Sequence, residues 1–113
     1  MVGETKEEQD NISKLQTILG PILYKCGLNC KYPVITGKSY RFYYNNPTTV
    51  DLCLIEVNRY LKNNLLTNKF NVLSSTSKIG DNVIIIQIKD KYFNTVDLDN
   101  MLTLIKMTRN KDE

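Results

Sequence analysis

The chain has 113 residues, a formal net charge of +3 and 42% hydrophobic residues, which is the size and composition of one ordinary globular domain. It contains no histidine, and this excludes zinc sites with histidine ligands and catalytic triads built on an imidazole base. No run of apolar residues reaches the roughly 18 positions that a membrane-spanning helix needs, so we expect no membrane span.

The first predicted element is a helix over residues 10–26. Its apolar side chains recur at spacings of three and four, which is typical of an amphipathic helix; they are Ile12, Leu15, Ile18, Leu19, Ile22, Leu23 and Cys26. Asp10 is predicted to be the N-cap, which leaves residues 1–9 as a flexible acidic N-terminus. Gly20 and Pro21 fall inside the apolar pattern, so we expect a kink, or a stop and a restart, at that point.

Two strands and a second helix follow. Residues 32–36 and 39–44 are rich in β-branched and aromatic side chains and are separated by a glycine and a lysine, which predicts a hairpin with a tight turn. Asn46 and Pro47 signal the start of a helix that runs to about residue 63. The apolar stripe of that helix is predicted to hold Val50, Cys53, Leu54, Val57, Tyr60 and Leu61.

A second pair of strands is predicted at residues 69–75 and 82–89. The sequence of the latter, NVIIIQIK, gives the strongest strand signal in the chain because its β-branched residues alternate. One face of this strand takes Ile84, Ile86 and Ile88. Val83 and Ile85 make the opposite face partly apolar as well, which indicates that something covers the second face of the sheet.

The last helix is predicted from residue 94 or 95 to residue 109, with residues 110–113 as a frayed tail. The element order is therefore α-β-β-α-β-β-α in a single α+β domain over residues 10–109. Short connections within each strand pair predict a small, mainly antiparallel sheet of about four strands, packed with helices.

This order is similar to that of the roadblock-type dynein light chains and the longin-like scaffolds, which assemble as dimers in adaptor complexes. The resemblance is one of topology, and it implies an assembly role rather than catalysis. Other small subunits with a β-α-β-β-α core match residues 38–109 nearly as well.

Three cysteines and no apolar signal segment at the N-terminus predict free thiols in an intracellular protein, cytoplasmic or nuclear. Cys26 and Cys30 are separated by three residues, which is not the C-x-x-C spacing of redox and zinc sites. Cys26 and Cys53 each continue an apolar helical stripe, so we interpret both as small core residues. We predict no metal and no cofactor.

Two further patterns could indicate an enzyme: a tripeptide of the phosphate-binding loop and the carboxylates at the ends of the predicted elements. Residues 36–39 contain the GKS of a phosphate-binding loop, but Tyr32 stands where that loop needs its first glycine, and a strand follows instead of a helix. Carboxylates at the ends of elements have capping and turn roles available to them; they are Asp81, Asp90, Asp97 and Asp99. We therefore predict that the protein is not an enzyme.

Residues 11–50 contain no acidic side chain and hold most of the aromatic residues of the chain. Basic side chains bind phosphates and aromatic rings stack on bases, at about 1–3 kcal/mol per base, in proteins that bind single-stranded nucleic acid. A packed sheet with a mildly basic surface explains the same residues, because aromatic side chains are common in strands. The candidate surface for a protein partner or a nucleic acid comprises Lys25, Lys31, Tyr32, Lys38, Tyr40, Arg41 and Tyr43.

The sequence thus predicts a non-enzymatic protein–protein interaction subunit, an adaptor in a larger intracellular complex. It would dock to a partner chain, or to a second copy as a homodimer, through a sheet edge or its helices. The alternative is a nucleic-acid-binding module that uses residues 24–44.

Overall fold

The computed structural model describes residues 6–26, 33–76 and 78–112. Three α-helices and four strands follow one another in the order α-β-β-α-β-β-α, which confirms the predicted α+β class. The helices are α1 (Lys6–Cys26), α2 (Pro47–Asn63) and α3 (Thr95–Asp112). The strands are β1 (Pro33–Thr36), β2 (Ser39–Tyr44), β3 (Phe70–Thr76) and β4 (Asn82–Ile88). Short 3-10 turns at Thr67–Lys69 and Asp90–Tyr92 precede β3 and α3.

Helix α1 is longer than predicted. It begins at Lys6, so the prediction of Asp10 as its N-cap is wrong, and residues 6–9 are helical rather than part of a flexible N-terminus. Glu7 and Glu8 in the first turn favour this earlier start, since their charges complement the positive end of the helix dipole. At the other end of the fold, α3 continues to Asp112, into the segment predicted as a frayed tail.

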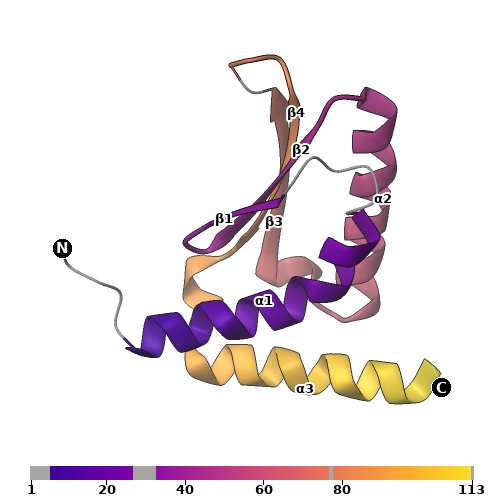
Figure 1. Ribbon diagram of the computed structural model, residues 1–113. Coiled ribbons are helices and arrows are strands. Elements are labelled where there is room, and N and C mark those ends of the chain that lie inside the picture. The colour runs from indigo at the N-terminus through magenta and orange to yellow at the C-terminus, as the bar shows by residue number, and fades with distance from the viewer. Residues whose placement is uncertain (1–5, 27–32, 77, 113) are drawn as a thin grey trace.

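Pro21 lies inside α1 without ending it. The proline lacks the N–H that would bond to the carbonyl one turn earlier. Ile18, Leu19 and Ile22 are fully or almost fully buried on both sides of it, and this packing keeps the helix continuous across the missing hydrogen bond. Helix α1 lies beside α3 over part of its length, and its last turns approach α2 (Figure 1).

Helix α2 begins as the sequence predicts. The side-chain oxygen of Asn46 accepts a hydrogen bond of 2.8 Å from the backbone N–H of Thr48, which satisfies one of the free donors at the helix start. Pro47 occupies the first turn, where no N–H is needed. The cap fixes the residue at which α2 begins after β2, and therefore which side chains of α2 face the sheet.

The four strands form one antiparallel sheet in the order β1-β2-β4-β3. The two long central strands, β2 and β4, place Phe42 opposite Ile84 and Arg41 opposite Ile85. In turn, Ile85 lies opposite Leu73 of the edge strand β3. Because side chains alternate along each strand, this register fixes two faces of different character.

One face of the sheet forms the core together with the helices. Its buried side chains come from both central strands and from β3: Tyr40, Phe42, Tyr44, Phe70, Ile84, Ile86 and Ile88. Helices α1 and α2 contribute their apolar stripes from the other side, and α3, which packs along α1, adds Leu98, Met101 and Ile105. Among the described helices, none carries an apolar stretch long enough to cross a bilayer.

Candidate functional site

We call the second face of the sheet the open face, because no described helix covers it, although Val83 on this face is only 5% exposed. In Figure 1, α2 stands on one side of the sheet, and no helix of the described chain stands on the opposite side. A row of residues crosses this open face from edge to edge, in the order Val34, Arg41, Ile85 and Leu73. Val34 and Ile85 are half-buried, whereas Leu73 is 50% exposed. The sequence predicted that something covers this face; no described helix of this chain does so.

Strand β3 forms one edge of the sheet, with β4 on one side and no described strand on the other. Each residue from Leu73 to Thr76 is exposed. The sequence of the strand, FNVLSST, contains neither a charged residue nor a proline. Charged residues and prolines are the usual means by which proteins keep a sheet edge from pairing with another chain. We call β3, with Leu73 at its middle, and the half-buried Ile85 beside it on the open face the edge surface.

Tyr40, one of the predicted surface residues, is a core residue with 1% of its surface exposed. It lies opposite Ile86 on the face that packs against the helices. It therefore offers no ring to a partner or to a base, and its assignment to the candidate surface is wrong. The reason is the register of the strands. The even-numbered residues of β2 lie opposite the even-numbered isoleucines of β4, which face the core, and so they face the core as well.

The described cations of the candidate surface do not gather. Lys25, in the last turn of α1, places its Nζ 3.7 Å from a carboxylate oxygen of Glu56 on α2. Lys38, in the turn between β1 and β2, places its Nζ 3.2 Å from a carboxylate oxygen of Asp90 and 5.1 Å from the centre of the Phe93 ring.

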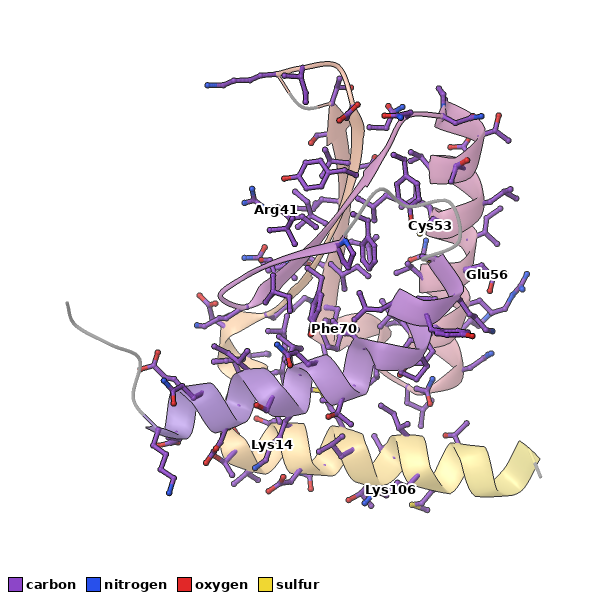
Figure 2. The ribbon with its side chains drawn as sticks, in the orientation of Figure 1. Lys14, Arg41, Cys53, Glu56, Phe70 and Lys106 are labelled. Atoms are coloured by element: carbon purple, nitrogen blue, oxygen red, sulfur yellow. The ribbon has the colours of Figure 1, made fainter. Side chains whose placement is uncertain are left out.

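Arg41 is exposed on the open face, and Tyr43 is half-buried on the same face. In Figure 2, Arg41 lies on the side of the sheet away from α2, far from Glu56, the partner of Lys25. Lys31 and Tyr32 lie outside the described residues. Only Arg41 and Tyr43 of the predicted set therefore share one described surface.

A small pocket lies at the other side of the fold, between the end of α1 and the middle of α2. It has a volume of about 80 Å³ and is lined by Lys25, Cys26, Tyr44, Thr49, Leu52, Cys53 and Glu56. Both cysteines are buried thiols, as the sequence predicted for core residues. Their contact with each other was not predicted, because it depends on how α1 and α2 pack.

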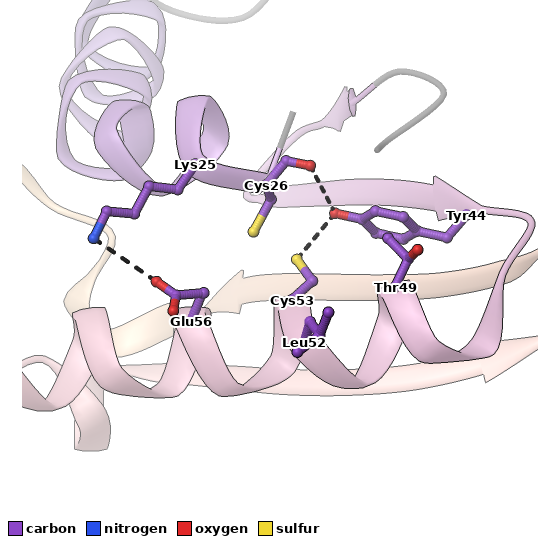
Figure 3. Close-up of a pocket in the computed structure, with 7 residues that line it drawn as sticks. All are labelled: Lys25, Cys26, Tyr44, Thr49, Leu52, Cys53 and Glu56. Atoms are coloured by element: carbon purple, nitrogen blue, oxygen red, sulfur yellow. Dashed lines mark hydrogen bonds and ion pairs between the residues drawn. The ribbon is translucent and has the colours of Figure 1, made fainter. Parts of the chain in front are cut away.

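The Tyr44 hydroxyl links the two helices at this thiol pocket. It lies 2.9 Å from the Cys53 Sγ and 3.3 Å from the backbone carbonyl oxygen of Cys26, and it can donate its hydrogen to either (Figure 3). A hydrogen bond from the Cys26 thiol lowers the pKa of Cys53 below its ordinary value, against the opposing effect of burial; the Tyr44 hydroxyl lowers it further. Glu56 acts in the opposite direction.

Metal binding has no support in the described part of the chain, where no group of three or more cysteine or carboxylate side chains is placed to hold an ion. A wider pocket of about 220 Å³ lies between α1, α2 and α3, lined by residues that include Pro21, Arg59, Tyr60 and Ile105.

The hydroxyl of Tyr40 has no hydrogen-bond partner among the described residues. Leaving a buried hydroxyl unpaired is unfavourable, so we expect Tyr40→Phe to raise the free energy of unfolding by about 1 kcal/mol. Urea unfolding at neutral pH measures this. Phenylalanine is the matched replacement because it keeps the ring and removes only the hydroxyl. A clear loss of stability would show that the Tyr40 hydroxyl does have a hydrogen-bond partner.

The same variant should also differ from the wild type in alkaline solution. Burial raises the pKa of Tyr40 above its ordinary value, which is about 10, so the unfolded chain loses this proton first. Ionisation of Tyr40 in the unfolded chain lowers the free energy of unfolding of the wild type as the pH rises above about 10, whereas below that pH it has no effect. We therefore expect the advantage of Tyr40→Phe over the wild type to grow above about pH 10.

No known protein family matches this chain, and no curated protein matches it. Solved structures that resemble it include the N-terminally truncated Plasmodium falciparum IMP-nucleotidase, with a TM-score of 0.45 and 12% identity over 92% of this chain. An IMP-bound mutant of the same enzyme gives a TM-score of 0.45 and 13% identity over 92% of this chain. This chain spans only 31% and 27% of those two chains. At TM-scores below 0.5 this likeness indicates nothing about the function of this chain.

Proposed function

We propose that this protein is a non-enzymatic assembly module, an adaptor-type subunit that joins other polypeptide chains through its edge surface, and that its first contact is with a second copy of itself along β3. The observation that carries the proposal is a seven-residue edge strand with no charge and no proline, with exposed Leu73 at its middle. The unpaired N–H and C=O groups along such an edge are ready to pair with another strand.

The two edges of the sheet differ in a way that favours β3. The opposite edge, β1, has four residues and begins at Pro33, and a short edge strand with a proline resists pairing. β3 is almost twice as long. A partner strand can therefore form more backbone hydrogen bonds on β3 than on β1.

A second copy suits this edge for a geometric reason. Two copies of β3 related by a twofold axis pair antiparallel, which is the pairing used throughout this sheet. Centring that pairing on Leu73, the middle residue of the strand, sets Leu73 against its own copy and Asn71 against Ser75. No pair in this register brings two like charges together. The two open faces would join into one surface with a row of apolar side chains at its centre.

Nucleic-acid binding receives less support from the arrangement of side chains. It would need several cations on one accessible surface. Lys25 and Lys38 lie with carboxylates at different places in the fold, and the open face carries Arg41 beside apolar residues. This arrangement therefore favours assembly through β3 over nucleic-acid binding.

Sedimentation of the purified chain tests the proposal. We expect the weight-average mass to rise from that of a monomer to that of a dimer between low micromolar and near-millimolar concentrations. A monomer at every concentration would contradict self-association. Growth beyond a dimer to open-ended aggregates would contradict the twofold pairing, because that pairing closes both β3 edges.

A further inference from the structure

The thiol pocket brings together two cysteines that stand far apart in the sequence. Cys26 ends α1, Cys53 lies in the middle of α2, and both line the same small pocket. Figure 3 shows the two sulfur atoms pointing toward one another, with the Tyr44 hydroxyl beside them. From these observations we propose that Cys26 and Cys53 are an oxidation site, which closes to a reversible disulfide when the protein meets a two-electron oxidant such as hydrogen peroxide.

The placement of the sulfurs meets the first requirement for such a bond. A disulfide joins sulfurs about 2.05 Å apart and needs side chains that point toward each other. Both thiols line one pocket and face each other in Figure 3, so closure of the bond requires side-chain rotation and an approach of the two sulfurs. Cys26 is the last residue of α1, where backbone hydrogen bonds are fewest, so this approach does not require the middle of a helix to move.

The pocket meets the second requirement, which is access for the oxidant. Its volume of about 80 Å³ holds several water-sized molecules, each of which needs at least roughly 15 Å³, so a peroxide molecule fits. Lys25 and Glu56 form the polar rim, with the Lys25 Nζ 3.7 Å from the carboxylate. The thiols are buried against protein on one side and reachable through this pocket on the other.

The surroundings also indicate which sulfur reacts first. The thiolate is the reactive form of cysteine. The hydrogen bonds from Cys26 and Tyr44 stabilise a thiolate at Cys53 and lower its pKa. Cys53 is therefore the nucleophile, and Cys26, in contact with it, is the resolving thiol.

The reaction balances in two steps. The Cys53 thiolate attacks one oxygen of hydrogen peroxide, the O–O bond breaks, and the departing hydroxide becomes water with the proton that Cys53 gave up; Cys53 is then a sulfenic acid. The Cys26 sulfur attacks the sulfenic sulfur, the S–O bond breaks, and the second hydroxide leaves as water with the Cys26 proton. Two thiols lose two electrons in total, and one peroxide is reduced to two waters.

The bond would tie the end of α1 to the middle of α2 around a loop that contains β1 and β2. Closing a loop of this size restricts the unfolded chain. We expect the oxidised protein to unfold at a temperature higher by roughly 10 °C, and to return to the original value with dithiothreitol. This inference is independent of the proposed assembly through β3, which lies at a different part of the surface.

Peptide mapping without reduction tests the proposal on the folded chain. Folded protein is treated with hydrogen peroxide, remaining thiols are alkylated, and the linked peptides are identified by mass spectrometry. We expect a peptide pair joined through Cys26 and Cys53, and its disappearance after dithiothreitol. Cys30→Ser is the matched control and should give the same pair, whereas Cys53→Ser should not.

The same oxidation in guanidinium chloride shows whether formation of the Cys26–Cys53 disulfide depends on the folded structure. In an unfolded chain, loop closure favours the two cysteines nearest in sequence, Cys26 and Cys30. A folded protein that gives mainly the Cys26–Cys53 link, and an unfolded one that does not, would support the proposal. A folded wild type that gives only links to Cys30, or only a sulfinic acid at Cys53 without any link, would overturn it. The peptide map of the oxidised wild type identifies the linked cysteines directly, so the test remains valid if Cys53→Ser does not fold.

Discussion

Leu73→Lys is expected to prevent the proposed dimer from forming and to leave a monomer. In the twofold pairing of β3, this substitution sets two lysines against each other and removes the apolar contact at the centre of the row. Like charges opposite one another and the lost burial together cost about 3 kcal/mol, which weakens association by about 100-fold. Sedimentation at a concentration where the wild type is a dimer measures the effect.

The fold itself should tolerate this change, since Leu73 is exposed at a sheet edge and lysine is a common residue at such edges. Met107→Lys is the matched control: Met107 is 55% exposed and lies on α3, the helix that packs along α1. It should leave the dimer intact. If both variants dissociate the dimer equally, the contact does not run along β3.

Mixing two charge variants tests the symmetry of the pairing. Leu73→Lys and Leu73→Glu should each be monomeric alone, because each repels its own copy. Combined in equal amounts, they should form a mixed dimer, since lysine then faces glutamate across the axis. Failure of the mixture to associate would contradict the contact of Leu73 with its own copy, even if the single variants behaved as expected.

Phe42→Ala is expected to destabilise the protein by about 3–5 kcal/mol, because it removes a fully buried ring from the middle of the core. Phe42 has 0% of its surface exposed and lies between Ile84 and the apolar stripes of the helices. A loss of this size is a large part of the roughly 5–15 kcal/mol that stabilises a typical domain. Urea unfolding followed by circular dichroism measures it.

Tyr43→Ala is the matched control for this substitution. Tyr43 is the next residue of the same strand, but its side chain lies half-buried on the open face. Its removal should cost less than half as much as the removal of Phe42. If the two substitutions destabilise the protein equally, the open face is not open, and something covers it in solution.

The strands could be predicted closely because they are short runs of β-branched and aromatic residues bounded by turn residues. The segment NVIIIQIK and its partner SYRFYY are such runs, and both are strands in the structure. The helix start at Lys6 was missed because residues 6–9 bear no apolar side chain and so show no period. Their tendency to form helix, together with two early glutamates, sets the start instead.

The site was harder to predict than the fold because it depends on contacts between distant elements. The sequence showed that Tyr40 and Arg41 point to opposite faces, but only the pairing of β2 with β4 decides which face is core. The contact of Cys26 with Cys53 likewise follows from the packing of α1 on α2. The edge surface did leave a signal in the sequence, since the predicted strand at residues 69–75 has no proline and no charged residue after Lys69. Its position at an edge follows only from the order of the strands.

Amide hydrogen exchange of β3, followed as the protein concentration is raised, tests the central claim most directly. The N–H groups of Phe70–Thr76 that point away from β4 are open to water in the monomer and hydrogen-bonded in the proposed dimer. Exchange of this segment should slow as the dimer forms, while exchange at the other edge, Pro33–Thr36, stays constant. Exchange of β3 that is fast and independent of concentration, in a sample that sedimentation shows to be dimeric, would contradict assembly through this edge.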